Sequence, residues 1–277
     1  MTTSSPAGNC PVDRNVRHKT MNDAVTIVCG DFESVLPTLE DECTQLVFTS
    51  PPYGVGMDYE NDIRLSVLFS KLNVMFREAA RITKRGGYVV VNFGDIIPAR
   101  DILGTDEPCE MPMGWVYWSF GLGHGLVLQA QRVWKKNFAK ITNGKHAISA
   151  PRPVPEAEHI YTFRKISGKP TEQKIRNRQI HQRAIWDTSE DAATGSKHPA
   201  AFPESLVARV IEIYTDTGDL VVDPFAGGGT VGVVAARMGR RAFLVEKEPG
   251  YCDEARERVS CVYLKDGQRL AGGNDNG

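Results

Sequence analysis

The chain has 277 residues, of which 41% are apolar and 24% are charged. This is globular usage, and it excludes disorder of the whole chain. No run of 18 apolar residues occurs, which excludes a transmembrane helix, and the first 20 residues lack the apolar segment of a secretory signal. The six cysteines include no CxxC pair. That argues against a zinc ribbon or a disulfide scaffold and predicts a cytoplasmic location.

The predicted elements alternate between strands and helices along the chain. Several strand segments are continuous apolar runs, which are typical of buried parallel strands. Seven segments are predicted to be strands: Val25–Val28, Gln45–Thr49, Tyr88–Phe93, Leu126–Trp134, Ile160–Phe163, Leu220–Asp223 and Arg241–Glu246. Four are predicted to be helices: 63–82, Pro203–Tyr214, Thr230–Met238 and Pro249–Val259. The pattern indicates an α/β fold with a doubly wound sheet and helices on both faces. Gly86 and Gly87 are predicted to end the first of these helices.

The chain is predicted to divide into two halves around a polar insert. No helical pattern separates the strands at 126–134 and 160–163, which predicts an antiparallel hairpin with a long loop over 135–159. The predicted organisation is as follows: a catalytic half over 21–164, a recognition insert or linker over 165–195, a cofactor-binding half over 196–265, and flexible tails over 1–20 and 266–277.

Positive charge is concentrated in one stretch of the chain. Residues 131–185 hold 13 Lys and Arg against 3 Asp and Glu, a balance of +10, while the whole chain has a formal net charge of −1. Aromatic residues are interleaved in this stretch, which favours binding of a polyanion, most simply nucleic acid. A solvated charged face is the alternative interpretation. The residues predicted to grip phosphates are Lys135, Lys136, Lys140, Lys145, Arg152, Lys174, Arg176, Arg178 and Arg183.

A glycine-rich turn follows the strand that ends at Asp223. Gly227, Gly229 and Gly232 satisfy the GxGxxG pattern, and Glu246 ends the next strand 19 residues after Gly227. Glycines at such a turn allow a ligand to approach the backbone, and a carboxylate at the next strand end binds ribose hydroxyls. Asp223 would repel a pyrophosphate, which argues against a nicotinamide cofactor. A zwitterionic nucleoside such as S-adenosylmethionine fits better, because its amino group is cationic. A turn that serves packing alone is the other alternative.

A second turn, Thr49-Ser50-Pro51-Pro52-Tyr53, directly follows the buried strand QLVF. Two prolines stiffen the backbone and leave its carbonyls as acceptors. Ser50 adds a hydroxyl, and Tyr53 adds a ring on which a base can stack. These groups suit an aromatic amine, since they supply acceptors for N–H groups and a stacking face.

Together these motifs resemble the β-class DNA amino-methyltransferases. In that family a [DNS]-P-P-[YF] turn comes first, the recognition region follows, and an FxGxG cofactor turn comes last. The resemblance implies a class I methyltransferase sheet of seven mostly parallel strands with an antiparallel seventh strand, S-adenosyl-L-methionine as cofactor and no metal. It implies catalytic roles for Ser50, Pro51, Pro52 and Tyr53. It implies cofactor-binding roles for Asp31, Phe32, Lys197, His198, Pro199, Asp223, Pro224, Phe225, Gly227, Gly229, Thr230 and Glu246.

The resemblance further implies site-specific methylation of double-stranded DNA on a base that is flipped out of the duplex. In the family the SPPY form goes mostly with the N4 amine of cytosine, and DPPY with the N6 amine of adenine. The expectation is therefore N4-cytosine methylation. The alternatives are N6-adenine methylation, an amine in RNA or protein, a nicotinamide oxidoreductase, and a nucleic-acid-binding protein without catalysis. The resemblance is compatible with a homodimer and with a partner restriction endonuclease.

Overall fold

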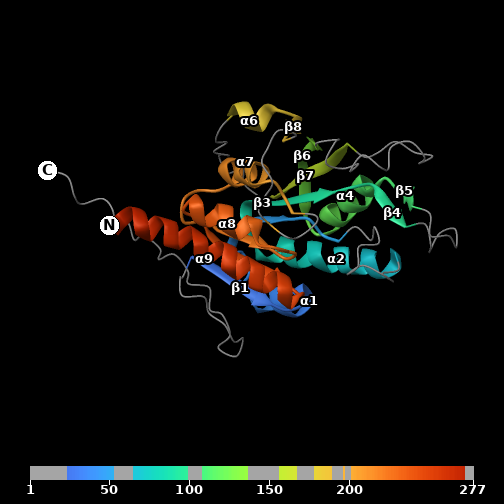
Figure 1. Ribbon diagram of the computed structural model, residues 1–277. Helices are drawn as coiled ribbons and strands as arrows, with labels where there is room; N and C mark the ends of the chain where they lie inside the picture. The colour runs from blue at the N-terminus through green and yellow to red at the C-terminus, as the bar shows by residue number, and fades with distance from the viewer. Residues whose placement is uncertain are drawn as a thin grey trace, which may run out of the picture.

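The computed structural model describes residues 24–52, 65–98, 108–136, 156–166, 178–188, 196 and 201–271. Eight strands form one sheet in the order β1-β10-β9-β2-β3-β7-β6-β8 (Figure 1). Their bounds are β1 (Val25–Cys29), β2 (Thr44–Thr49), β3 (Thr83–Phe93), β6 (Leu126–Lys135), β7 (Ala157–Lys165), β8 (Ile185–Asp187), β9 (Leu220–Asp223) and β10 (Arg241–Glu246). A separate two-stranded sheet pairs β4 (Ile96–Pro98) with β5 (Pro108–Glu110).

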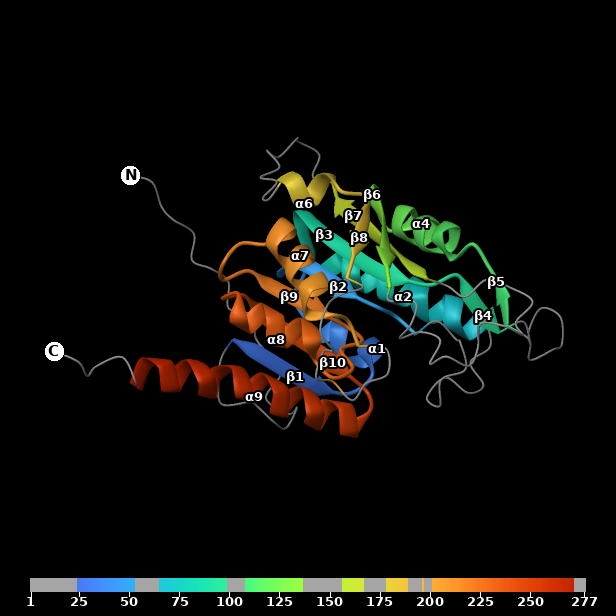
Figure 2. The same ribbon diagram turned by 45° about the horizontal axis from the view of Figure 1, so that its top comes forward.

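The helices cover both faces of the sheet, as the alternation of elements predicts (Figure 2). Their bounds are α1 (Phe32–Val35), the 3₁₀ turn η1 (Leu36–Thr38), α2 (Leu65–Ile82), α4 (Met113–Gly123), α6 (Arg178–Gln182), α7 (Glu204–Tyr214), α8 (Thr230–Arg237) and α9 (Pro249–Ala271). None of the helices formed by these described residues combines the length and the apolar character of a membrane span.

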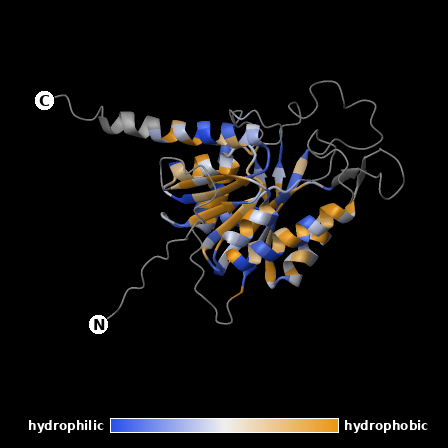
Figure 3. Cartoon of the chain, turned by 90° about the horizontal axis from the view of Figure 1, so that it is seen from below, coloured by the Kyte–Doolittle hydropathy of each residue, from blue (hydrophilic) through white to orange (hydrophobic). Residues whose placement is uncertain are grey.

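Alternate residues of each central strand enter two separate cores. Along β2, Leu46 and Phe48 pack with the residues of α7 and α8, whereas Val47 packs with those of α1, α2 and α4. The same alternation holds in β3, β9 and β10. Both faces are therefore apolar, and the central strands are orange throughout the middle of the sheet in Figure 3. This double burial explains why these strands are continuous apolar runs in the sequence.

The predicted doubly wound, mostly parallel sheet is confirmed. Neighbouring strands from β1 to β3 pair in parallel, and β7 runs antiparallel to both β3 and β6. The predicted hairpin therefore exists. The sheet has one strand more than predicted, because β8, from within the predicted insert, pairs with the edge of β6. Buried Arg132 holds this segment: its guanidinium donates to the His181 carbonyl oxygen at 2.9 Å and lies 4.9 Å from the Trp186 ring centroid.

Two local predictions are wrong, and one long helix was not predicted. Gly86 and Gly87 do not end α2 but lie inside β3. There a side chain at Gly87 would come within 2.8 Å of the Gln45 carbonyl oxygen. Helix α2 ends instead at Ile82, and the Thr83 hydroxyl donates to the Ala79 carbonyl oxygen at 2.6 Å.

The second wrong prediction and the missed element both concern helices. Helix α9 continues to Ala271, into the predicted C-terminal tail. Helix α4 was not predicted, because its glycines and aromatic residues show no amphipathic period. Packing against β7 requires glycine at position 121, since a Cβ there would lie 2.5 Å from the Phe163 ring.

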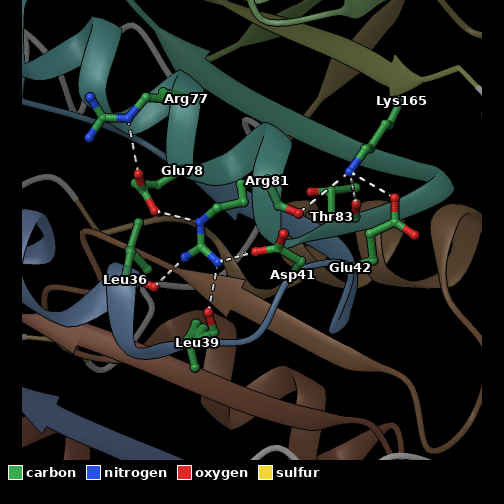
Figure 4. A network of polar contacts seen from close by, with 9 residues as sticks. All are labelled: Leu36, Leu39, Asp41, Glu42, Arg77, Glu78, Arg81, Thr83 and Lys165. Atoms are coloured by element: carbon green, nitrogen blue, oxygen red, sulfur yellow. Dashed lines mark hydrogen bonds and ion pairs between the residues drawn. The ribbon is translucent and has the colours of Figure 1, made fainter.

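A polar network joins α2 to the segment between β1 and β2 at the amino ends of the strands (Figure 4). The Arg81 guanidinium donates to Glu78 at 2.9 Å and to Asp41 at 2.7 Å. It also donates to the carbonyl oxygens of Leu36 and Leu39, both at 2.8 Å. The Glu78 side chain is only 7% exposed, so its buried negative charge depends on the ion pair with Arg81. Arg81 thereby fixes the chain that leads into β2.

We predict that Arg81→Met lowers the free energy of unfolding by about 2 kcal/mol, because it leaves Glu78 buried with a weaker partner. Urea unfolding measures this difference. The control is Arg85→Met, which removes an ion pair from a side chain that is 67% exposed. It should change stability by less than about 0.5 kcal/mol. Equal decreases in the free energy of unfolding of both variants would show that Arg81 does not stabilise the protein by neutralising buried Glu78.

Candidate active site

The two predicted turns meet at the centre of the sheet. Strands β9 and β2 are neighbours, with Val47 beside Val222. From β9 the chain continues to β10 on one side, and from β2 it continues to β3 on the other. This reversal of strand order is a topological switch point, where doubly wound proteins bind ligands at the carboxyl ends of the strands. Ser50 and Asp223 both stand at these ends.

Asp223 is the most perturbed acid described at this site. It is 2% exposed, and its Oδ1 accepts from the Thr49 hydroxyl at 2.6 Å and from the Phe225 N–H at 3.1 Å. Burial raises the pKa of its carboxyl to about 7, although these two hydrogen bonds act to lower it. The negative charge of Glu246 adds to the rise. A carboxylate in this setting is stabilised by a cationic ligand.

Glu246 lies at the end of β10, beside the glycine turn. Its Oε2 accepts from the Gly227 N–H at 2.8 Å, and its Oε1 accepts from the Glu248 N–H at 2.9 Å. Each carboxylate oxygen retains a further acceptor position. These two backbone donors hold the side chain in one orientation, which suits a ligand that offers two neighbouring hydroxyls.

The glycine turn itself is held by packing against α9. Gly229 has a φ of 77°, and a Cβ there would lie 2.7 Å from the Ala255 Cβ. A Cβ on Gly228 would collide with the Ser196 hydroxyl. Arg258 donates to the Gly228 carbonyl oxygen at 2.5 Å and to the Thr230 hydroxyl at 3.1 Å. Packing therefore requires Gly228 and Gly229, and what faces the Glu246 carboxylate is the Gly227 N–H.

Asp31 and Phe32 follow β1, next to the end of β10. Asp31 caps α1, since its carboxylate accepts from the Glu33 N–H at 2.9 Å. Phe32 is buried and packs against Phe225, with ring centroids 4.7 Å apart. Pro224 and Thr230 are buried within the turn, whereas Phe225 is only half-buried. Phe32 thus supports Phe225 from behind, and Phe225 is the more accessible of the two rings.

The described part of the second turn is Ser50, Pro51 and Pro52. Pro51 is buried, and Ser50 and Pro52 are half-buried. The Ser50 hydroxyl lies 3.4 Å from Oδ1 of Asn92, a long hydrogen bond to the neighbouring strand β3. Asn92 in turn donates from Nδ2 to the His159 carbonyl oxygen at 3.0 Å. Ser50 is therefore connected through Asn92 to β7.

Sequence reasoning placed Thr49 in the second turn without a role for its side chain, and it missed Asn92, Asp95 and His159 as parts of this edge. Asp95 accepts from the Met113 N–H at 2.9 Å, and its other oxygen lies 2.8 Å from His159 Nε2. This hydrogen bond raises the pKa of His159, although burial opposes the rise. A signal for Asn92 and Asp95 exists in the sequence, since both are polar residues at the end of the apolar run YVVV. His159 has no such signal in the sequence: it reaches this edge because the antiparallel pairing of β3 with β7 places it beside Phe93.

The predicted phosphate contacts that the structure describes fall into two groups. Lys135 and Lys136 lie at the carboxyl end of β6, the edge of the sheet that carries Ser50. Both are ion-paired: Lys135 lies 3.0 Å from Asp187, and Lys136 contacts Glu158. Arg178, in α6, and exposed Arg183 come before β8, toward the opposite edge. Lys135 and Lys136 thus share an edge of the sheet with Ser50, in a strand that β3 and β7 separate from β2, and their role as phosphate contacts stays a prediction.

Several predicted site residues lie outside the described part of the chain. These are Tyr53, Lys140, Lys145, Arg152, Lys174, Arg176, Lys197, His198 and Pro199. Their roles stay predictions. Within the described ranges, no three His, Cys, Asp or Glu side chains form a cluster able to hold a metal ion.

Comparison with known proteins identifies the relatives of this chain. A family model for N6/N4 methyltransferases, described as DNA methylase, matches residues 44–257. The type II methyltransferase M.BglI of Bacillus subtilis is 26% identical over 303 residues, with 85% of each chain covered. The DNA adenine methyltransferase YhdJ of Escherichia coli K12 is 25% identical, and the match covers 90% of this chain and 87% of YhdJ.

A solved structure shares the fold. It is a DNA modification methylase from Thermus thermophilus, complexed with S-adenosyl-L-methionine. The two chains are 28% identical and superpose with a TM-score of 0.64, with 85% of this chain and 93% of that chain covered.

The buried Asp223 carboxyl makes a prediction about stability. Its pKa is about 7 in the folded chain against an ordinary 3.8, so the folded chain binds this proton more tightly than the unfolded chain does. The stability that this protonated carboxyl contributes is full below about pH 3.8 and is lost as pH rises to about 7. We predict that Asp223→Asn, which retains the accepting oxygen, raises the free energy of unfolding at pH 8 by a few kcal/mol.

At pH 5 this gain should be markedly smaller, because the wild-type carboxyl is then mostly protonated as well. Urea unfolding at the two pH values measures the difference. A gain that is the same at pH 5 and pH 8, or a loss at pH 8, would contradict the assigned burial cost.

Proposed function

Because the chain belongs to the N6/N4 DNA methylase family, we propose that it methylates the exocyclic N4 amine of cytosine in double-stranded DNA. The chain is a DNA methyltransferase that uses S-adenosyl-L-methionine. The choice of cytosine rests on Ser50, since the family resemblance associates SPPY with N4-cytosine. Similarity to an adenine methyltransferase of E. coli makes N6-adenine the second candidate.

One observation supports a single active site built from both turns. The Thr49 hydroxyl donates to Asp223 at 2.6 Å, across 174 residues of sequence. Thr49 precedes the catalytic turn, and Asp223 begins the cofactor turn. Groups that bind the methyl donor and groups that bind the acceptor amine are therefore adjacent, as direct transfer between them requires.

The residues present fit the cofactor. Asp223 offers a buried carboxylate for the α-ammonium group, and Glu246 offers oriented carboxylate oxygens for the ribose hydroxyls. Half-buried Phe225, supported by Phe32, offers an apolar face for the adenine. The cofactor, when bound, supplies an activated methyl group on its sulfonium.

The catalytic turn would act on the target amine. The base must leave the duplex to reach the site, which costs a few kcal/mol of stacking and pairing. We assign the Ser50 hydroxyl and the Pro51 carbonyl oxygen to accept hydrogen bonds from the amine, and Tyr53 to stack on the base. These acceptors turn the amine lone pair away from the ring. The Ser50 hydroxyl can accept from the amine while it donates to Asn92, because a hydroxyl has one hydrogen and two lone pairs.

The substrate contacts are proposed to include Lys135 and Lys136, whose present partners Asp187 and Glu158 would be exchanged for phosphates. The remaining basic residues of 131–185 would add phosphate contacts along the duplex. A homodimer and a partner endonuclease stay predictions from the sequence.

We predict that wild-type protein, incubated with S-adenosyl-L-methionine and mixed-sequence duplex DNA, produces N4-methylcytosine. Digestion to nucleosides and mass spectrometry detect it. Ser50→Ala removes one acceptor for the amine and should lower kcat about 10- to 100-fold. Its affinity for the cofactor, measured by calorimetry, should stay within about twofold of wild type, since the proposal assigns Ser50 to the acceptor amine and not to the cofactor.

N6-methyladenine as the product would preserve the family assignment and reject the proposed base. A Ser50→Ala variant that keeps full kcat would reject the assigned role of this hydroxyl. A loss of cofactor affinity equal to the loss of kcat would mean that the substitution disturbs the whole site and that Ser50 has no separate catalytic role.

A further inference from the structure

The two hydrogen bonds that Asp223 receives both end on the same oxygen. The Thr49 hydroxyl and the Phe225 N–H donate to Oδ1, at 2.6 Å and 3.1 Å. Within the described ranges, no donor reaches Oδ2. The protein donors therefore fix the carboxyl group by one oxygen and leave the other for a ligand.

The Thr49 hydroxyl has a position that packing alone does not explain. Thr49 is fully buried at the end of β2, where it pairs with Val91 of β3. Valine fits such a site equally well and has a higher tendency to form strands in an apolar interior. Burial of a hydroxyl costs free energy unless it is hydrogen-bonded, and the Thr49 hydroxyl is bonded to the Asp223 carboxylate.

We propose that Thr49 is a positioning residue for cofactor binding: its hydroxyl orients the Asp223 carboxylate so that Oδ2 receives the α-ammonium group of S-adenosyl-L-methionine. Thr49 is covalently joined to Ser50, so the same hydrogen bond fixes the catalytic turn relative to the bound amino-acid end of the cofactor. This inference rests on the proposed function in its use of the cofactor, and it does not depend on which base is methylated.

The charges and donors around Asp223 explain why the Thr49 hydroxyl affects its ionisation. Among the described residues, the charged group that acts on Asp223 is Glu246 from β10, and its negative charge opposes ionisation. The donors that favour the carboxylate are Thr49 from β2 and the Phe225 N–H. Removal of the Thr49 hydroxyl leaves one of these two donors. The carboxyl then binds its proton more tightly, and an ammonium ligand must displace that proton.

The test compares two ligands that differ in the amino-acid group. S-Adenosylhomocysteine carries the ammonium and carboxylate groups, whereas 5′-methylthioadenosine has the same nucleoside and lacks both. We expect Thr49→Val to raise the Kd of S-adenosylhomocysteine about tenfold at pH 7.5, the loss of one charge-assisted hydrogen bond. The Kd of 5′-methylthioadenosine should change less than twofold. Isothermal titration calorimetry measures both.

Two controls separate positioning from structural damage. Thr49→Ser keeps the hydroxyl and should bind both ligands within about threefold of wild type. The loss caused by Thr49→Val should also grow between pH 8.5 and pH 6, because the Asp223 carboxyl of the variant is protonated at higher pH. Melting temperatures of the three proteins establish that each is folded.

Equal weakening of both ligands by Thr49→Val would overturn the proposal, because it would indicate general damage to the cofactor turn. Unchanged binding of S-adenosylhomocysteine, or a loss in Thr49→Ser as large as in Thr49→Val, would overturn it as well. Failure of the proposed base assignment looks different: the wild type would yield N6-methyladenine while the ligand discrimination by Thr49 persists.

Discussion

The arrangement of the candidate active site depends on a buried hydrogen bond between the ends of two neighbouring parallel strands. Thr49 closes β2 and Asp223 closes β9, and the contact between their side chains joins turns that are 174 residues apart. Under the proposed function, neither turn alone would hold both the methyl donor and the acceptor amine. The register that pairs Leu46 with Val221 and Val47 with Val222 brings the two ends level, so that their turns open on the same edge.

This arrangement has a cost in stability. The Asp223 carboxyl is 2% exposed and lies in the field of the negative charge of Glu246, at the end of β10; burial first and this charge second raise its pKa to about 7. Two donors on Oδ1 offset part of that cost, and a bound ammonium group offsets more. Under the proposed function, the site would therefore be destabilised in the protein alone and stabilised by the ammonium group of the cofactor, as is common where function requires a buried charge.

The rest of the fold supports this edge from a distance. Arg81 fixes the segment that leads into β2 from the opposite end of the strands, and Arg132 attaches β8 beyond the hairpin. On the other side, Arg258 and Ala255 of α9 hold the glycine turn in its left-handed conformation. Arg81 and Arg258 thus act on backbone that leads into or forms the two turns, whereas Arg132 acts on the edge of the sheet.

The sequence by itself determined the fold class, the position of seven strands and the two turns, because these depend on local signals. Apolar runs such as QLVF and LVVD mark strands buried on both faces, and the prolines and glycines mark their ends. The motif order from Ser50 to Gly229 also indicated the family. Helix α4 and strand β8 were not predicted, because neither segment has a periodic pattern of apolar residues. Their residues suit contacts with β7 and β6, which the sequence does not reveal.

Only the tertiary structure decided how the site residues act on one another. In the sequence Thr49 begins the second turn and its side chain has no assigned role, whereas in the structure its hydroxyl donates to Asp223. Gly229 fits a ligand-binding pattern but is required by packing against α9, and Gly228, outside that pattern, is required by packing against Ser196. Lys135 and Lys136 belong to a basic stretch, yet they are paired with acids that the strand register brings beside them. Such contacts join residues far apart in the chain, and a local pattern carries no information about them.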